Sequence, residues 1–347
     1  MALSKLWVDP AVAGPGAGTE GDPHASTEYA ILNNAFGAGG TQINLKTGTD
    51  DVLAAQLDAA LITAGWTPSE ATPLVIRGYA TAENDGGQGQ LDGGGLVSII
   101  STTRDFISLI DLKMGNTGAN IIASLDSNGM IIRCESHTCT GTGFQVASYG
   151  VIKSCYLHHA CAVNRSGLVL SGAGAVASFN HVALTGAAAG NGIYASSIGT
   201  RVEDNIIIMP PGVGTSAMSG INSIEAYLVS NSIYSAAAHV GVGINNVINS
   251  TLLELTNNLI EGFSGIGGKA VSHAANTSVR YQGGNAYFNC ASGFDAPANH
   301  VIMDLGDNET LSASPFEDAS TGDFRSVNTG NVRAGALPNI IGGGLVP

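Results

Sequence analysis

The sequence predicts an all-β fold in which short parallel strands wind into a solenoid behind a helix-containing N-terminal cap. Three observations support this prediction. Of the 347 residues, 48 are glycine and 12% are charged, which disfavours long helices because glycine destabilises a helix interior. Between residues 73 and 290, short β-rich runs alternate with Gly, Asn and Ser. A marker residue recurs along these runs at intervals of 21 to 27 residues, the period of a solenoid coil.

The marker occupies one position of a turn in each coil. Asparagine fills this position in five coils, at Asn180, Asn205, Asn231, Asn258 and Asn285. Cys134 and Cys155 hold the same position in two earlier coils, and Asp111 extends the series toward the N-terminus. An apolar residue generally stands three positions before the marker and another stands two positions after it. This gap of five breaks the two-residue period of a strand, so a turn lies at or beside the marker.

Asparagine suits such a turn because it tolerates the left-handed backbone conformation better than most residues do. When equivalent turns stack at the ~4.8 Å spacing of neighbouring strands, their side-chain amides can hydrogen-bond to one another. We therefore predict that the five asparagines form a structural ladder along the solenoid.

Three regions follow from this pattern. Residues 1–72 are predicted to form the N-terminal cap, residues 73–290 the coils, and residues 291–347 a C-terminal cap or contact arm. A cap is required because the open end of a solenoid exposes unpaired backbone and apolar side chains.

Within the N-terminal cap we expect a helix near residues 25–36, a strand at 41–45 and a second helix near 50–64. Asp50 and Asp51 stand where the second helix would begin, and carboxylates at that end complement the helix dipole. The cap is thus predicted to carry both helices.

Charge and hydropathy exclude several classes of protein. The formal net charge is −14, which argues against binding to nucleic acid or to an anionic membrane surface. The chain contains no run of 18 apolar residues, so we expect no membrane insertion. Its N-terminus lacks the apolar stretch of a secretion signal, and its five cysteines are too few for a disulfide-stapled scaffold. We expect synthesis in a reducing cytoplasm.

Four segments carry a family resemblance. They are LWVDPAVAGPGAGTEGDP, HASTEYAILNNAF, PLVIRGYATAENDGGQGQLDGGG and SPFEDASTGDFR. Together they resemble the N-terminal strand, cap helix, first coil and post-coil segment of the pectate-lyase-like superfamily. The resemblance implies a single-stranded, right-handed parallel β-helix, and it is closest to virion proteins of phages. The superfamily contains lyases, hydrolases, tailspikes and inert structural proteins, so the fold does not name a function.

The charged residues of the coils supply few candidates for catalysis. Hydrolysis of a sugar chain needs two carboxylates on one face, and Glu203 and Asp204 are the adjacent acidic pair within the coils. A pectate-lyase-like mechanism would need a calcium-binding acidic cluster and a basic residue, for which Arg133 and Lys153 are the candidates. Solvated outer-face residues are the competing interpretation, and it suits such scattered charges better. We assign no catalytic residue and keep these four as candidates.

The sharpest local cluster contains histidines and cysteines. Its members are Glu135, His137, Cys139, His158, His159, Cys161 and His181. His137 and His158 both stand three residues after a marker, so stacked coils would place them roughly 5 Å apart. That spacing permits a metal site of His137, Cys139, His158 and Cys161, or a disulfide. Packing is the competing interpretation, because cysteine behaves as a small buried hydrophobe. We predict neither a metal nor another cofactor.

Two function classes follow. The first is a non-enzymatic structural or adhesive protein, a decoration, spike or fibre component of a phage virion that contacts other virion proteins and a host-surface glycan. The resemblance implies a homo-oligomer, specifically a trimer, and location in the virion or outside the cell. The alternative is a polysaccharide lyase or glycoside hydrolase acting on an acidic or host-surface glycan. A bacterial surface adhesin is a third reading, which the missing secretion signal disfavours.

Overall fold

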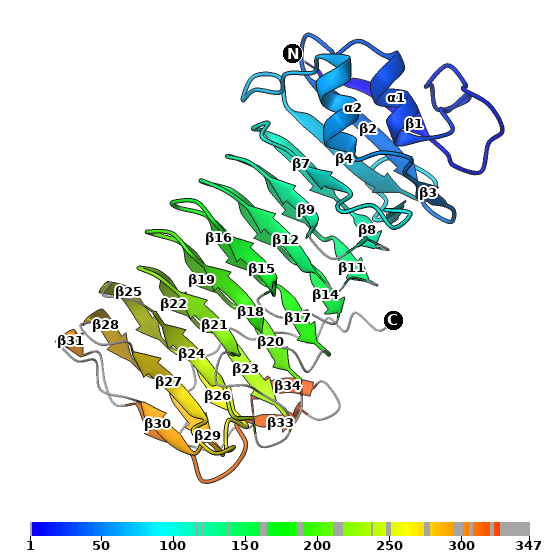
Figure 1. The fold of residues 1–347 in the computed structure, drawn as a ribbon. Coiled ribbons are helices and arrows are strands. Elements are labelled where there is room, and N and C mark those ends of the chain that lie inside the picture. Colours follow the sequence, from blue (N-terminus) through cyan, green and yellow to red (C-terminus); the bar gives the residue numbers. More distant parts are fainter. Residues whose placement is uncertain are drawn as a thin grey trace.

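The computed structural model is a parallel β-solenoid (Figure 1). It describes residues 2–326 apart from 116, 119–120, 138, 140, 160–164, 186–189, 211–217, 237–238, 248–250, 274–277, 295–300, 305–307 and 320–322. Within these residues the chain passes repeatedly through three parallel sheets, so that each strand pairs with the equivalent strand of the next coil. This architecture confirms the predicted fold class.

The three sheets have twelve, eleven and nine strands among the described residues. The twelve-stranded sheet contains β1 (Ser4–Val8), β2 (Thr41–Lys46), β4 (Leu74–Tyr79), β7 (Ile107–Ile110), β10 (Met130–Ile132), β13 (Val151–Lys153), β16 (Val176–Ser178), β19 (Arg201–Glu203), β22 (Tyr227–Val229), β25 (Thr251–Thr256), β28 (Ser278–Gly283) and β31 (Val301–Asp304). The eleven-stranded sheet contains β3 (Asp50–Val52), β5 (Gly89–Asp92), β8 (Leu112–Gly115), β11 (Glu135–His137), β14 (Tyr156–His159), β17 (His181–Leu184), β20 (Ile206–Met209), β23 (Ser232–Ser235), β26 (Leu259–Glu261), β29 (Ala286–Phe288) and β32 (Glu309–Thr310).

The nine-stranded sheet contains β6 (Ile100–Ser101), β9 (Ile121–Leu125), β12 (Thr142–Val146), β15 (Arg165–Leu170), β18 (Gly190–Ala195), β21 (Ser219–Ser223), β24 (Val242–Asn246), β27 (Lys269–His273) and β30 (Ser292–Phe294). A short antiparallel pair, β33 (Phe316–Asp318) and β34 (Asp323–Ser326), lies outside these sheets. Strands of the solenoid therefore occur on both sides of the predicted coil region, residues 73–290.

Stacked apolar side chains fill the interior of the solenoid. Ile131 pairs with Ile152, Ile152 with Ala177, and Ala177 with Val202, which continues the column to Leu228. All of these side chains are fully buried. Because successive strands are in register, one inward position per strand builds a continuous apolar column. These are the residues that the sequence places three positions before each marker.

The residue before each marker, rather than the marker itself, adopts the left-handed conformation. Ser154, Phe179 and Asp204 have φ values of 55°, 57° and 57°. This residue bends the chain outward between the twelve- and eleven-stranded sheets, so the next residue points inward. Asp111 belongs to the bending position, with φ 54°, and the following Leu112 is the inward residue. Its placement in the marker series was wrong by one residue, because apolar spacing alone cannot distinguish two adjacent turn positions.

The five asparagines form an uninterrupted hydrogen-bonded column inside the solenoid. Each side-chain amide nitrogen donates to the amide oxygen of the next asparagine, over 2.9 Å from Asn180 to Asn205 and 3.0 Å from Asn205 to Asn231. The column continues at 3.0 Å to Asn258 and 2.9 Å to Asn285. A sixth member, Asn308, accepts from Asn285 at 2.8 Å.

Two helices lie at the N-terminal end of the solenoid (Figure 1). Helix α1 spans Thr27–Asn33, and Ser26 caps it by accepting a hydrogen bond from the backbone N–H of Tyr29 at 3.1 Å. Helix α2 spans Leu57–Ala64. No helix within the described residues is long and apolar enough to span a membrane.

The predicted start of the second helix was wrong. Residues Asp50–Val52 form strand β3, which pairs with β5. The carboxylate of Asp51 is buried and accepts a hydrogen bond from the backbone N–H of Thr27 at 2.7 Å. It therefore caps the other helix, α1. Pairing with a strand 40 residues away determines the conformation of this segment. A local charge pattern contains no information about such a distant partner.

The segment Leu311–Ala319 packs on the outer side of the eleven-stranded sheet. Phe316 is buried there, with its ring 6.4 Å from that of Tyr234 on β23 in an edge-on arrangement. Leu259 of β26 and Ala286 of β29 belong to the same apolar cluster. The outer sides of these three strands are therefore covered by the C-terminal segment.

Candidate functional site

The two predicted bases lie on neighbouring coils but serve structural contacts. Arg133 makes a two-pronged ion pair with Asp111, with Nε–Oδ1 and Nη2–Oδ2 distances of 2.6 and 2.7 Å. The ammonium of Lys153 lies 5.4 Å from the centre of the Phe179 ring, a cation–π contact. Ile132 pairs with Lys153, so Arg133 aligns with Ser154 rather than with Lys153. Arg133 and Lys153 thus lie on neighbouring coils, as the sequence predicts, but their charged groups do not meet at one site.

The predicted acidic pair lies further along the same side of the solenoid. Glu203 accepts a hydrogen bond from Nη2 of Arg201 at 3.0 Å. Asp204 occupies the bending position with φ 57°, and burial together with neighbouring Glu203 raises its pKa. Strand β16 separates this coil from that of Lys153. The four catalytic candidates therefore do not converge.

The predicted metal ligands diverge. His137 points outward on β11, whereas Cys139 is buried in the apolar core, where its sulfur accepts a hydrogen bond from the backbone N–H of Gly141 at 3.2 Å. Ser136 pairs with Leu157, so His137 and His158 occupy equivalent positions on adjacent strands. Cys161 lies outside the described residues. Cys134, Cys139 and Cys155 are free, buried thiols.

Among the residues that the structure describes, no group of three or more His, Cys, Asp or Glu side chains is arranged to hold a metal ion. Neither the His/Cys site nor the acidic calcium cluster of a pectate-lyase-like mechanism is formed by them.

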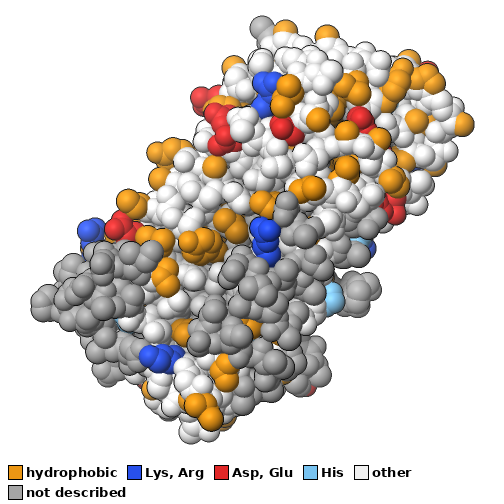
Figure 2. Space-filling model, in the orientation of Figure 1, with side chains coloured by type: hydrophobic (Ala, Val, Ile, Leu, Met, Phe, Trp, Pro, Cys, Tyr) orange, Lys and Arg blue, Asp and Glu red, His pale blue; other side chains and the backbone are white. Residues whose placement is uncertain are grey.

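A different set of side chains does converge, on the outer side of β8, β11, β14 and β17. We call it the histidine face, and it consists of Lys113, Glu135, His137, Tyr156, His158 and His181. Lys113 pairs with Glu135, Glu135 with Tyr156, and Tyr156 with His181, so these four form one outward column. His137 and His158 form the next outward column. Figure 2 shows histidine side chains at the surface along the edge where β11 and β14 lie in Figure 1.

Ring and charge contacts hold the histidine face together. The Tyr156 ring is nearly parallel to that of His158, with ring centres 6.5 Å apart, and edge-on to that of His181 at 5.0 Å. Lys113 Nζ lies 3.3 Å from Oε1 of Glu135. Both side chains of this pair remain partly exposed, at 34% and 27%.

A glycine makes room for the His137 ring. Gly115 on β8 pairs with His137 on β11. A Cβ atom at Gly115 would lie 2.6 Å from both Cε1 and Nδ1 of His137 and 2.3 Å from its carbonyl oxygen. A side chain at this position would therefore displace the imidazole.

The surroundings keep two imidazoles uncharged at neutral pH. Burial and nearby His158 lower the pKa of His181 to about 4. Burial and the charge of Lys113 lower the pKa of His137, against the opposing effect of Glu135. A neutral imidazole carries a lone pair that can accept a proton. The histidine face thus combines a proton acceptor, a phenol and an ammonium.

Sequence reasoning grouped Glu135 with the histidines of this face, but it did not place Lys113 and Tyr156 with them. The signal was present, because Tyr156 stands one residue after its marker, as Glu135 and His181 do after theirs. Lys113 escaped because Asp111 had been placed one position out of register. Correcting the turn position aligns Lys113 with Glu135.

Comparisons with known proteins identify the fold of this chain. No family model matches the chain, and no curated protein matches it in sequence. The pectate lyase Pel9A is similar in structure, with a TM-score of 0.54 and 13% identity over 90% of this chain and 77% of the lyase. A GH136 lacto-N-biosidase from Eubacterium ramulus has a TM-score of 0.52 and 11% identity over 88% of this chain and 68% of its own. A rhamnogalacturonan lyase has a TM-score of 0.51 and 12% identity over 95% and 97%.

At these identities, the similarity establishes the parallel β-solenoid fold alone. The neighbours are polysaccharide lyases and a glycoside hydrolase, so the solenoid expected from the pectate-lyase-like resemblance is present. None of the three is described as a virion protein. The predicted phage origin therefore has no support from these comparisons.

Proposed function

We propose that the protein binds an acidic polysaccharide across the histidine face and cleaves it by β-elimination. The observation that carries the proposal is the convergence of His137, Tyr156 and Lys113 on adjacent strands of one partly exposed surface. The structural neighbours support this class of substrate, because two of them are named as lyases of pectate and rhamnogalacturonan.

Each group has a role in binding or in moving a proton. Lys113 faces the carboxylate of a uronate unit and offsets its charge, which acidifies the adjacent C–H. Tyr156 offers its ring as a surface against which a sugar can stack. Neutral His137 accepts the proton from the carbon next to the carboxylate. The C–H electrons form the new C=C bond, the glycosidic C–O bond breaks, and the leaving oxygen takes a proton from the Tyr156 hydroxyl.

Hydrolysis fits this face less well. Glycoside hydrolases use two carboxyl groups roughly 5 to 9.5 Å apart, one as acid and the other as base or nucleophile. Glu135 is the one carboxylate among the six residues of the histidine face, so this set does not supply the second carboxyl group that hydrolysis needs. An uncharged imidazole and an ammonium can supply the base and the charge neutralisation that elimination uses.

The test is a panel of uronate-containing and neutral polysaccharides, with unsaturated product followed by ultraviolet absorbance. We expect product from at least one uronate polymer, and a fall of about 100-fold or more in rate for His137→Ala and for Tyr156→Phe, the scale of lost acid–base catalysis. Lys113→Ala should also be slow, whereas Lys153→Ala, which removes an exposed lysine of neighbouring β13, serves as the matched control. Full activity in His137→Ala would refute the assigned base.

A non-catalytic adhesive role is the second candidate. The observation that favours it is that the outer-surface cations Arg133 and Lys113 are paired with carboxylates. Such ion pairs suit a role in stabilising the surface. Retention of a glycan on the immobilised protein without unsaturated product would identify this role. The homo-oligomer, specifically a trimer, the virion partners and the virion or extracellular location stay predictions, and native mass spectrometry of the isolated assembly tests them.

A further inference from the structure

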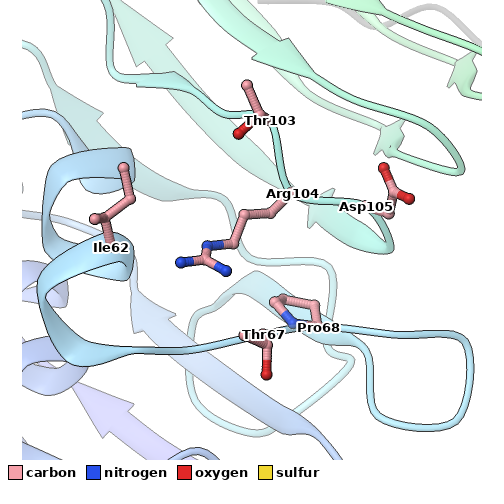
Figure 3. Close-up of a pocket in the computed structure, with 6 residues that line it drawn as sticks. All are labelled: Ile62, Thr67, Pro68, Thr103, Arg104 and Asp105. Atoms are coloured by element: carbon pink, nitrogen blue, oxygen red, sulfur yellow. The ribbon is translucent and has the colours of Figure 1, made fainter.

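A pocket lies at the junction between the N-terminal cap and the first coils (Figure 3). Its volume is about 350 Å³, and it is lined by Ile62, Thr67, Pro68, Thr103, Arg104 and Asp105. Ile62 belongs to α2, and residues 103–105 lead from β6 into β7. The histidine face lies on the eleven-stranded sheet, which does not contain these strands, so the two sites occupy different sides of the coil.

The guanidinium of Arg104 is the chemical centre of this pocket. Figure 3 shows it in the space between the Ile62 side chain and the Pro68 ring. Its Nε is buried without a hydrogen-bond partner, and Arg104 makes no ion pair with any residue that the structure describes. The backbone N–H of Arg104 donates to Oγ1 of Thr102 at 2.9 Å, which fixes the turn. The carboxylate of Asp105 points away from the guanidinium (Figure 3).

An unsatisfied arginine in a pocket favours a particular ligand chemistry. A buried donor without an acceptor costs about 1–3 kcal/mol, and a ligand that supplies the acceptor removes that cost. The planar fork of N–H groups matches the two oxygens of a carboxylate. A single cation, with Asp105 nearby, suits one negative charge better than the two of a phosphate ester.

The rest of the pocket indicates what carries the carboxylate. Ile62 is 58% exposed and, with Pro68, offers an apolar wall, while Thr67 and Thr103 add hydroxyl groups. The volume lies at the lower end of small-molecule sites and far exceeds the needs of an inorganic anion. A sugar ring has both an apolar face and hydroxyls. We propose that this pocket binds a single carboxylated sugar unit, a hexuronate, with its carboxylate on Arg104.

The test uses galacturonate as the probe and neutral galactose as its matched control, with the full-length protein. Chemical-shift changes of the backbone amides of Thr67 and Thr103 report binding at the pocket itself. We expect saturable changes with galacturonate and none with galactose. Arg104→Gln should weaken binding of galacturonate about ten-fold or more. Arg104→Lys keeps the charge but loses the planar fork of N–H groups, so its affinity should lie between those of the wild type and Arg104→Gln. Arg280→Gln, which removes an exposed guanidinium on β28, should bind as the wild type does.

Two further arms separate the alternatives. Tyr156→Ala disrupts the histidine face and should leave these shift changes intact, so failure of the proposed elimination reaction and failure of this pocket are distinguishable. Inorganic phosphate should compete weakly. Equal binding of phosphate and galacturonate would reduce the pocket to a simple anion site and overturn the proposal. Equal responses to galacturonate and galactose, or full affinity in Arg104→Gln, would overturn it as well.

Discussion

At the scale of single residues, the buried asparagines do what no apolar residue could do in their place. The amide of Asn231 donates to the Val202 carbonyl at 2.8 Å and to Oδ1 of Asn258 at 3.0 Å. Its own oxygen accepts from the side-chain and backbone nitrogens of Asn205 at 3.0 and 3.2 Å. The turn leaves backbone groups inside the solenoid that strand pairing does not satisfy, and the asparagine satisfies them. Cys155 ends the ladder, because only its backbone N–H bonds to Asn180, at 2.9 Å.

This bonding predicts the effect of removing one amide. Replacing Asn231 by Ala removes four hydrogen bonds from a fully buried site, those to the Val202 carbonyl and to Oδ1 of Asn258 and the two from Asn205. It leaves the backbone N–H of Asn205 without its acceptor. Because each unsatisfied buried group costs about 1–3 kcal/mol, we expect the free energy of unfolding to fall by about 3 kcal/mol or more. Urea unfolding followed by circular dichroism measures it. Asn245→Ala, on the outer side of β24, is the control, and an equally large loss there would contradict the ladder's role.

At the scale of elements, some features were readable from the sequence and others were not. The inward column was predictable because Ile131, Ile152 and their equivalents recur at a fixed distance from the marker. The His137–His158 alignment followed from the same count. The β3 segment was not predictable, because pairing with β5 overrides the helix signal of Asp50 and Asp51. The inward turn of Cys139 and the convergence of Lys113 with Glu135 also depend on the exact turn position, which the repeat alone leaves uncertain by one residue.

The docking of one element, the C-terminal segment Leu311–Ala319, depends on the protonation state of Glu261. Ser314 donates a hydrogen bond to Oε2 of Glu261 at 2.7 Å. Burial raises the pKa of Glu261, and the Ser314 hydrogen bond opposes this only in part. A carboxyl with a higher pKa in the folded chain favours folding when it is protonated. This contribution is complete below the usual glutamate pKa and is lost as pH rises through the raised value.

We therefore expect the docking of this segment to weaken as the pH rises from the ordinary glutamate pKa toward neutrality. Glu261→Gln keeps a neutral group at every pH and should lose less stability over that range. The measurement is the difference in Tm between wild type and Glu261→Gln at successive pH values, which should grow with pH. Glu203→Gln retains Glu261 and should follow the wild-type profile. A Tm difference that is constant with pH would contradict this account.

At the scale of the whole molecule, one continuous apolar core runs from Val8 in β1 to Val279 in β28. Each coil contacts its two neighbours, so the stability of a solenoid is the sum of its coils and the interfaces between them. The ends have one interface each and would expose an unpaired strand. At the N-terminal end, β1 is the last strand of the twelve-stranded sheet, and it pairs through its whole length with β2.

Removing β1 tests whether this end strand limits association. Deletion of residues 2–9 would leave the backbone groups on one edge of β2 unpaired, because the other edge pairs with β4, and would uncover the apolar side chains against which Leu6 and Val8 pack. An exposed parallel edge of this kind is a template for pairing with another chain. We expect the shortened protein to form larger species than the full chain at equal concentration, detected by sedimentation velocity, with retained sheet content by circular dichroism. Identical sedimentation of the two proteins over a ten-fold concentration range of about 1–10 µM would show that the helices α1 and α2 protect this end without β1.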